Sequence, residues 1–251
     1  MSGRVTAAIV QARLASTRLP GKVLLPLAGR TVIEHVLHRC SSIPGVDVVV
    51  CAVPESAECD VLAAEASRCG AMVFRGSELD VLDRYFRAAR SVCANIIMRV
   101  TSDCPLIDPE VCGQVLALRE RAGADYACNN MPASWPHGLD CESFTMEALE
   151  CAAREARLPF EREHVTPWIR TQDRFSRVNL ACPYEGMSGW RWTLDYPEDF
   201  GFMNAAFKNL AAWPAIPCLD AVVALLKARP DIAAINASRT DPSRLASQIQ
   251  I

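Results

Sequence analysis

The first half of the chain alternates short apolar runs with stretches of helical periodicity. Continuous apolar runs predict buried strands at 6–12, 46–53, 71–75 and 95–101. Apolar residues at helical spacing predict helices at 31–40, 57–69 and 80–91 and from Pro109 onward. The first of these opens with Thr31 and Glu34 at the spacing of a capping box. Strands that are apolar throughout, rather than alternating between apolar and polar residues, and that are separated by helices are typical of an α/β fold. In this fold a parallel sheet has helices on both faces.

The pattern is less regular after about Tyr126. Proline and glycine interrupt residues 128–144; beyond them, helices are expected near 145–156 and 161–171 and a strand near 175–181. Residues 189–200 predict a strand that ends at Asp195, with Pro197 opening the next helix. The final stretch, 238–251, fits either a docked helix or a frayed end.

Ligands of parallel α/β sheets bind beyond the carboxyl ends of the strands. The loops expected to form a site are therefore 11–23, 53–57, 75–80 and 101–108.

Composition narrows the class of protein. At 251 residues the chain can form one large α/β domain or two small ones. Its net charge of -3 argues against a nucleic-acid partner, which would require a basic face. The 12 cysteines are scattered without a C-x-x-C pair, which favours a reducing cytoplasm. Neither a signal peptide nor a membrane-spanning run is recognisable, so a cytoplasmic protein without a membrane partner is expected.

The loop after the first predicted strand concentrates positive charge. Arg13, Arg18 and Lys22 fall within ten residues, and Lys22 is one of only three lysines. Ser16, Thr17 and Gly21 leave backbone N–H groups approachable, so the loop could clamp a polyphosphate. It lacks the P-loop pattern, and a solvated basic loop is the alternative.

Two acidic residues are expected at strand ends. Asp103 follows the strand at 95–101, and Asp195 ends the strand predicted at 189–195. Carboxylates there can bind Mg²⁺, which usually takes one or two carboxylates together with substrate phosphates. Asp108 is expected to cap the helix that opens at Pro109. Glu198 and Asp199 fall in the first turn of a helix, where acidic side chains favour the helix dipole.

The stretch RGSELDVLDRY, residues 75–85, is a third candidate. Gly76 and Ser77 form a tight turn between strand and helix whose backbone could face a base edge. Asp80, Asp83 and Arg84 offer further polar contacts. The alternative is an ordinary capped helix with an Asp–Arg pair.

The segment ARLASTRLPGKVLLPLAGRTVIEHV resembles the N-terminal signature of the cytidylyltransferases that activate acidic sugars, such as CMP-3-deoxy-manno-octulosonate synthetase and acylneuraminate cytidylyltransferase. Five further segments resemble the spore-coat polysaccharide biosynthesis branch of that family: RGSELDVLDRY, RVTSDCPLIDPE, HGLDCESF, EREHVTP and RWTLDYPEDF. The resemblance runs in order from about Ala8 to Asp199.

The resemblance implies a Rossmann-like nucleotide-diphospho-sugar transferase fold in a single domain, 1–251. It implies a mostly parallel sheet, with an acceptor-binding and dimerisation region at 128–192. The implied reaction is transfer of CMP from CTP to an acidic acceptor with release of pyrophosphate, in a Mg²⁺-dependent homodimer. A 3-deoxy-2-keto sugar acid, for surface polysaccharide, is the expected acceptor; an aminoalkylphosphonate fits the same chemistry.

The family's motifs assign roles to individual residues. Arg13, Lys22, Asp103 and Asp195 are the expected catalytic residues, and Asp103 and Asp195 the expected metal ligands. Nucleotide contacts are expected from Ala12, Arg13, Ser16, Arg18, Lys22, Arg75, Gly76, Ser77, Asp80 and Asp103. Acceptor contacts are expected from His137, Asp140, Glu142, Glu163, His164 and Arg191. Arg191 or Arg162 could hold the acceptor's anionic group.

Two other classes stay open at this point. A glycosyltransferase would bind a finished nucleotide sugar on a similar fold, but its usual D-x-D is missing at the expected strand end. A non-catalytic nucleotide-binding protein would need the clamp but not both acids. His137 and His164 could serve as general bases, although metal coordination can activate an acceptor oxygen without one.

Overall fold

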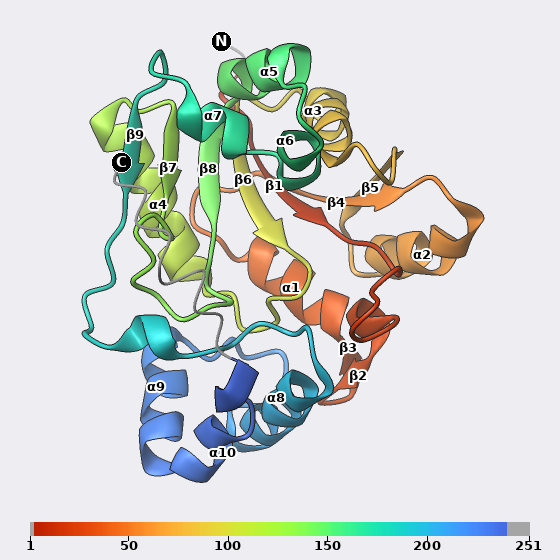
Figure 1. The fold of residues 1–251 in the computed structure, drawn as a ribbon. Helices are drawn as coiled ribbons and strands as arrows, with labels where there is room; N and C mark the ends of the chain where they lie inside the picture. Colours follow the sequence, from red (N-terminus) through yellow and green to blue (C-terminus); the bar gives the residue numbers. More distant parts are fainter. Residues whose placement is uncertain (1–2, 240–251) are drawn as a thin grey trace.

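A seven-stranded sheet forms the centre of the computed structural model, which describes residues 3–239 (Figure 1). Its order is β5-β4-β1-β6-β8-β7-β9. The strands are β1 (Thr6–Gln11), β4 (Val48–Pro54), β5 (Met72–Gly76), β6 (Ile96–Thr101), β7 (Tyr126–Cys128), β8 (Glu142–Thr145) and β9 (Arg177–Asn179). Only β8 runs antiparallel to its neighbours within this sheet. The predicted α/β class with a mostly parallel sheet is confirmed.

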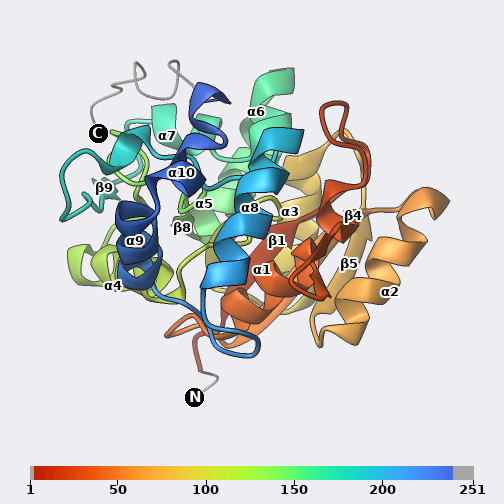
Figure 2. The ribbon, with the colours of Figure 1, turned by 90° about the horizontal axis from the view of Figure 1, so that it is seen from below.

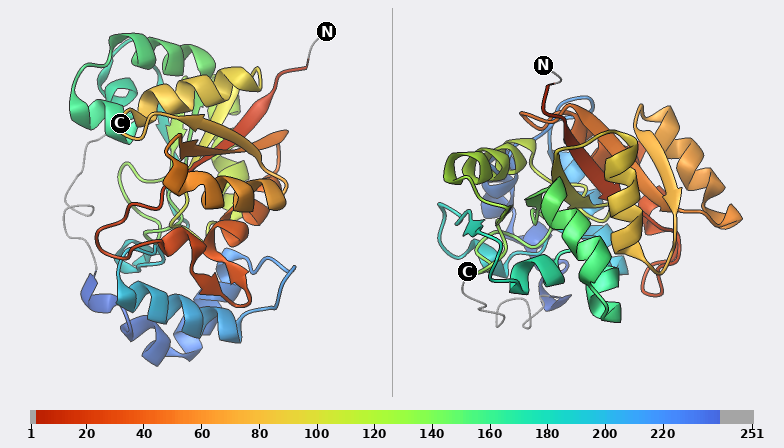
Figure 3. Two further views of the ribbon diagram at one scale, coloured as in Figure 1. Left: turned by 90° about the vertical axis from the view of Figure 1, so that its right-hand side faces the viewer. Right: turned by 90° about the horizontal axis from the view of Figure 1, so that it is seen from above.

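Alternation along β1 divides the interior into two cores. Ala7 and Ile9 point into one core and Ala8 and Val10 into the other. The first core contains residues of α3 (Val81–Ser91), α5 (Met146–Glu155) and α7 (Pro167–Thr171). The second contains residues of α1 (Val32–Ser41), α2 (Asp60–Arg68) and α4 (Pro109–Ala122). Helices thus cover both faces, and the view from above shows α3 and α5 side by side (Figure 3).

A third core lies beyond the carboxyl ends of β1 and β6. It contains α8 (Pro197–Asn209), α9 (Leu219–Ala228) and α10 (Pro230–Ala234), which lie in front of the sheet in the view from below (Figure 2). Trp135, Trp192 and Leu27 are buried against these helices. Leu27 belongs to a small ribbon of β2 (Pro26–Leu27) and β3 (Arg30–Thr31). This layer lies at the end of the sheet at which ligands are expected to bind.

Three of the predicted helix starts are confirmed. Thr31 accepts a hydrogen bond from the backbone N–H of Glu34, and Asp80 does the same for that of Asp83. Asp108 caps α4 by accepting from Glu110 and Val111. Side-chain acceptors satisfy N–H groups that a helix leaves unpaired at its start. The Glu34 carboxylate, however, pairs with arginines, so the capping box is only half formed.

Two element predictions are wrong. The expected helix at 161–171 is divided into α6 (Pro159–His164) and α7, because Pro167 cannot continue a helix and Val165 has a φ of 72°. Residues 189–195 form no strand of a sheet. Apart from one bridge between His137 and Arg191, this extended segment pairs its backbone with loops.

Other boundaries shift slightly. The helix expected at 57–69 begins as a 3-10 turn, η2 (Ala57–Cys59), before α2, and the strand expected at 175–181 is shorter, β9. The remaining 3-10 turns are η1 (Lys22–Leu24), η3 (Met187–Gly189) and η4 (Ala237–Arg239). Most of the final stretch, 240–251, lies outside the described residues. Among the helices of the described part, none has the length and apolar character needed to cross a bilayer.

Candidate active site

A cavity of about 560 Å³ opens at the carboxyl ends of β1 and β6, the end to which the arrowheads of these strands point in Figure 1. This volume is typical of a small-molecule site. The loop after β1, the loop after β6, the start of α3, the end of α6 and Asp195 contribute its walls. The lining residues are Gln11, Ala12, Arg13, Ala15, Ser16, Thr17, Arg18, Lys22, Val81, Arg84, Thr101, Ser102, Asp103, Glu163, His164 and Asp195.

The loop after β1 turns back on itself to present its cations to the cavity. The N–H groups of Ser16 and Gly21 both donate to the Leu14 carbonyl, at 2.9 and 3.2 Å. Gly21 has a φ of 65°, the left-handed region that glycine adopts most easily, and η1 begins at the next residue. This turn places Lys22 at the cavity wall.

The Lys22 ammonium joins the two candidate metal ligands. Its Nζ donates to Asp103 Oδ2, to Asp195 Oδ1 and to the Leu194 carbonyl, each at 2.8 Å. Arg18 donates to the same oxygen of Asp195 at 2.7 Å. Two carboxylates from segments 92 residues apart therefore converge on one cation, Lys22, at the cavity wall.

The charges in this cluster stabilise one another. Burial would raise the pKa of Asp195, but Lys22 and Arg18 outweigh it and hold that pKa well below its usual range. Burial and Asp195 act against ionisation of Asp103, yet Lys22 lowers the pKa of this carboxyl as well. Burial of Lys22 is outweighed by both carboxylates, so the pKa of its ammonium is raised. All three groups are charged at neutral pH.

A buried aspartate holds the segment that carries Asp195. Asp199 is fully buried and accepts from the backbone N–H groups of Asp195 and Tyr196 at 2.9 and 3.0 Å. It also pairs with Arg191, whose guanidinium reaches Asp195 Oδ2 at 3.2 Å. Asp199 therefore positions Asp195, a larger role than the helix-dipole contact expected from its place in the first turn.

The same segment packs tightly against the loop at 137–138. Trp192 N–H donates to the His137 carbonyl at 2.6 Å, and His137 N–H donates to that of Trp190 at 2.9 Å. Gly138 has a φ of 115°, and a Cβ there would lie 2.4 Å from the Trp192 carbonyl carbon. Only glycine allows this approach.

The cavity brings together about half of the residues predicted for the site. Those that line it are Ala12, Arg13, Ser16, Arg18, Lys22, Asp103, Asp195, Glu163 and His164. Those that lie outside its lining are Arg75, Gly76, Ser77, Asp80, His137, Asp140, Glu142 and Arg191. Partial burial lowers the pKa of His164, which favours a neutral imidazole at the cavity wall.

The residues of the 75–80 turn, which were expected to contact the nucleotide, have hydrogen-bond and ion-pair partners within the protein. Arg75 pairs with Asp60 and the Ser56 carbonyl, and Ser77 Oγ accepts from the Asp80 N–H at 3.0 Å. The Asp80 carboxylate pairs with Arg162, which also donates to the Ala153 carbonyl. Both arginines expected to hold an acceptor anion, Arg162 and Arg191, already have acidic partners.

Glu142 belongs to a closed ion-pair network. Its side chain is 2% exposed and pairs with Arg99 and Arg170. Tyr126 and Thr166 donate their hydroxyls to it. Burial would raise the pKa of Glu142, but the two arginines outweigh it and lower that pKa strongly. These contacts link β6, β7, β8 and α7.

Sequence reasoning assigned no role to five lining residues: Gln11, Ala15, Val81, Thr101 and Ser102. Thr17 and Arg84, which were expected to offer polar contacts, also line the cavity. Gln11 and Thr101 end β1 and β6, and their position at strand ends was a usable signal. Arg84 lies in the apolar stripe of α3 with Val81, Tyr85 and Ala88. A charged residue in such a stripe was a second signal.

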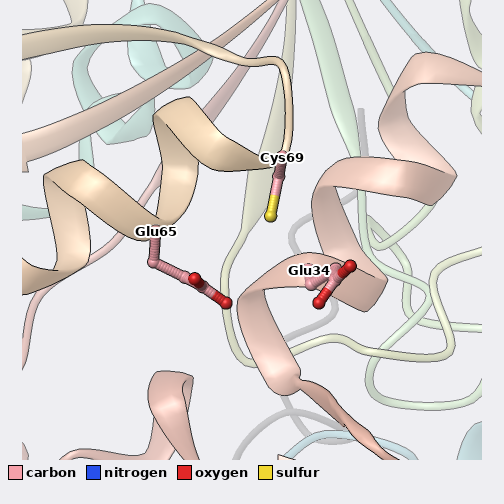
Figure 4. A group of neighbouring side chains, drawn as sticks. All are labelled: Glu34, Glu65 and Cys69. Carbon is pink, nitrogen blue, oxygen red and sulfur yellow. The ribbon is translucent and has the colours of Figure 1, made fainter.

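A second group of potential metal ligands lies between α1 and α2 (Figure 4). It consists of Glu34, Glu65 and Cys69. Arg68 donates to both carboxylates, at 2.7 Å to Glu34 and 2.8 Å to Glu65. Burial raises the pKa of the Cys69 thiol to about 11, which keeps it protonated. The contacts indicate an ion-pair cluster that joins two helices.

Comparison with known proteins decides the family. The cytidylyltransferase family model matches residues 7–198, a span that contains every residue of the cavity wall. The chain belongs to the cytidylyltransferase family. It is 32% identical to the spore coat polysaccharide biosynthesis protein SpsF of Bacillus subtilis over 232 residues, 90% of this chain and 95% of that protein.

Solved structures agree with this assignment. A cytidylyltransferase from Leptospira borgpetersenii is 29% identical, with a TM-score of 0.85 over 92% of this chain and 97% of that one. The structure of CMP:2-keto-3-deoxy-manno-octonic acid synthetase, complexed with CTP, has a TM-score of 0.63 at 17% identity over 80% of this chain and 97% of its own, and shows the shared fold. The protein is thus a nucleotidyltransferase with cytidylyltransferase activity, rather than a glycosyltransferase or a non-catalytic binding protein.

Proposed function

We propose that this cytidylyltransferase transfers CMP from CTP to a small acidic acceptor and releases pyrophosphate. The observation that carries the proposal is the convergence of Asp103 and Asp195 on the Lys22 ammonium, in a cavity walled by the arginine-containing loop. Paired carboxylates beside clustered cations suit a polyphosphate substrate.

In the proposed reaction the acceptor oxygen attacks the α-phosphorus of CTP. A bond forms between them, the bond from the α-phosphorus to the bridging oxygen of pyrophosphate breaks, and the acceptor hydroxyl's proton passes to water. Arg13, Arg18 and Lys22 lie where they can neutralise charge on the phosphates. Catalysis then rests on positioning and on electrostatic stabilisation.

Asp103 and Asp195 are the proposed ligands of Mg²⁺. The donor set fits, because both carboxylates already share one cation and each uses a single oxygen at 2.8 Å. When bound, the ion would neutralise phosphate charge and activate the acceptor oxygen. Asp199 and Arg191 keep Asp195 in place for this role.

The proposed acceptor is an acid of the 3-deoxy-2-keto sugar class, with an aminoalkylphosphonate as the alternative. Glu163 and His164 at the end of α6 line the cavity and are proposed to contact it. The similarity to SpsF, whose name refers to spore coat polysaccharide, supports a role in surface polysaccharide synthesis. Pyrophosphate release with each acceptor, measured with CTP present, would separate the two classes.

We also propose a cytoplasmic homodimer that uses the region 128–192. Leu158 and Phe160 of this region are 61% and 60% exposed, and apolar side chains of this size favour an interface. All twelve cysteines are free, as expected in a reducing compartment. Light scattering should give the mass of a dimer for wild type and of a monomer for Phe160→Glu, and a monomeric wild type would refute the dimer. Cell fractionation tests the location.

A thermal-shift titration tests the nucleotide preference without knowledge of the acceptor. CTP, UTP, ATP and GTP are compared with and without Mg²⁺. A ligand that binds only the folded state adds about 2.7 kcal/mol of stability at a hundred times its Kd. CTP with Mg²⁺ should give the largest shift. An equal shift from all four nucleotides would contradict the proposal.

A further inference from the structure

Arg84 is a buried cation in the wall of the cavity. Its exposed fraction is 1%, and it lies in the first turn of α3. The positive end of the helix dipole is at this turn and disfavours a cation. By contrast, the buried Arg119 lies in the last turn of α4, where the dipole favours positive charge.

The hydrogen-bond partners of Arg84 are backbone carbonyls rather than carboxylates. Its Nη1 donates to the carbonyls of Ser77 and Glu78, while its buried Nε has no hydrogen-bond partner. Among residues 3–239, no carboxylate forms an ion pair with it. Burying an unpaired charge is costly, so a site that keeps one is suited to an anionic ligand.

The other cations of the cavity differ in whether they have acidic partners. Lys22 and Arg18 are neutralised by Asp103 and Asp195. Arg13 is exposed at the cavity wall and has no ion-pair partner within the described part of the chain. Burial lowers the pKa of Arg84 and the charge of Arg13 lowers it further, which together outweigh the opposing effects of Tyr85 and Glu78. Two like charges therefore face one region of the cavity.

We propose that Arg84 binds a phosphate oxygen of the CTP triphosphate and of the departing pyrophosphate, together with Arg13. This inference rests on the proposed use of CTP. Arg84 then has two functions: its Nη1 holds the turn after β5, and the rest of its guanidinium faces the polyphosphate. Gly76 makes this possible, because a Cβ there would lie 3.2 Å from Arg84 Cγ.

The test compares Arg84→Met with Arg87→Met. Arg87 lies on the same helix, is 55% exposed and pairs with Asp83 on the surface. Binding of CTP, pyrophosphate and cytidine is measured by calorimetry or NMR. Arg84→Met should weaken CTP and pyrophosphate about tenfold, the effect of losing a charge-assisted hydrogen bond. Cytidine, which has no phosphate, should bind as it does to wild type.

The outcomes separate the possible roles. Equal weakening of cytidine and CTP would mean that Arg84 acts only by holding the turn, which overturns the proposal. Unchanged pyrophosphate binding overturns it as well, whatever happens to an acceptor. If the wild-type protein binds neither CTP nor pyrophosphate, the proposed function and this inference both fail. If wild type binds both and only Arg84→Met binds them weakly, the loss is due to Arg84. A native melting transition of the variant is the check on folding.

Discussion

The molecule contains two ion-pair networks that differ in how far a ligand can reach their carboxylates. In one, Asp103 and Asp195 share Lys22, and the Asp103 side chain is 26% exposed. In the other, Glu142 lies between Arg99 and Arg170 and is only 2% exposed. Both contain carboxylates whose pKa values are lowered by neighbouring cations.

The difference shows that charge pairing alone does not identify a site. The Glu142 network is completed by protein donors, including the Tyr126 and Thr166 hydroxyls, and joins strands to α7. The Asp195 network lies at the cavity wall, where Lys22 is the only lysine and Arg18 is half exposed. The first network is suited to stability and the second to exchange of partners with a ligand.

The largest expected effect comes from the open network. Asp103→Asn removes one of the two charges proposed to hold Mg²⁺, so CMP transfer should fall about a thousandfold. The melting temperature should change little, because Lys22 keeps Asp195 and the Leu194 carbonyl as partners. Pyrophosphate release assays and thermal melts check both expectations.

Asp173→Asn is the matched control, since Asp173 is exposed in the loop before β9. It should keep wild-type activity. Near-normal activity of Asp103→Asn would remove the basis for the metal assignment.

The closed network should respond in the opposite way. Glu142→Gln leaves two arginines without their anionic partner and should cost about 3 kcal/mol of unfolding free energy. Denaturant titration measures this loss. The control is Glu155→Gln, which removes only exposed pairs with Arg154 and Arg174 and should have a small effect. Equal stability of the two variants would refute a stabilising role for Glu142.

The pH dependence sharpens this prediction. Because the pKa of Glu142 is lower in the folded state than its ordinary value of 4.5, its ionised form stabilises the fold fully above that value. The stabilisation is lost as the pH falls below it toward the folded pKa. The stability difference between wild type and Glu142→Gln should therefore be constant from neutral pH to about 5 and shrink below 4.5. A difference that grows in acid would contradict the sign.

The elements and the opening loop were predictable because their signals are local. The caps Thr31, Asp80 and Asp108 lie within three residues of the N–H groups that they satisfy. Lys22 and Asp103 could be predicted as cavity residues because they lie in loops at the carboxyl ends of strands, where parallel sheets bind ligands. The three short strands β7, β8 and β9 were harder, since three or four residues carry little periodicity.

The roles of Glu142 and Asp199 could not be read from local pattern. Glu142 resembles any acidic residue of an irregular region, and its partner Arg99 is 43 residues away. Asp199 has the position of an ordinary helix-start acid, but Asn236, 37 residues later, donates to it. Their contacts depend on tertiary packing, which periodicity does not specify. Arg84 lies between these two cases. Its position in the apolar stripe of α3 could be seen in the sequence, but its place in the cavity wall could not.

The smallest expected effect tests whether the open network exchanges partners. The Lys22 ammonium lies between the two proposed metal ligands, so a divalent cation must compete with it in the nucleotide-free protein. Lys22→Met should therefore bind Mn²⁺ about tenfold more tightly than wild type without nucleotide. Electron paramagnetic resonance of free Mn²⁺ measures this directly.

The matched control is Lys208→Met, at an exposed position of α8, which should bind Mn²⁺ as wild type does. Unchanged Mn²⁺ affinity in Lys22→Met would mean that the ion binds elsewhere or that Lys22 leaves the carboxylates at no cost. A gain that also required Asp103, and was absent from Lys22→Met combined with Asp103→Asn, would place the competition at this carboxylate pair. Arg99 and Arg170 offer no such exchange, because their partner Glu142 is closed to solvent.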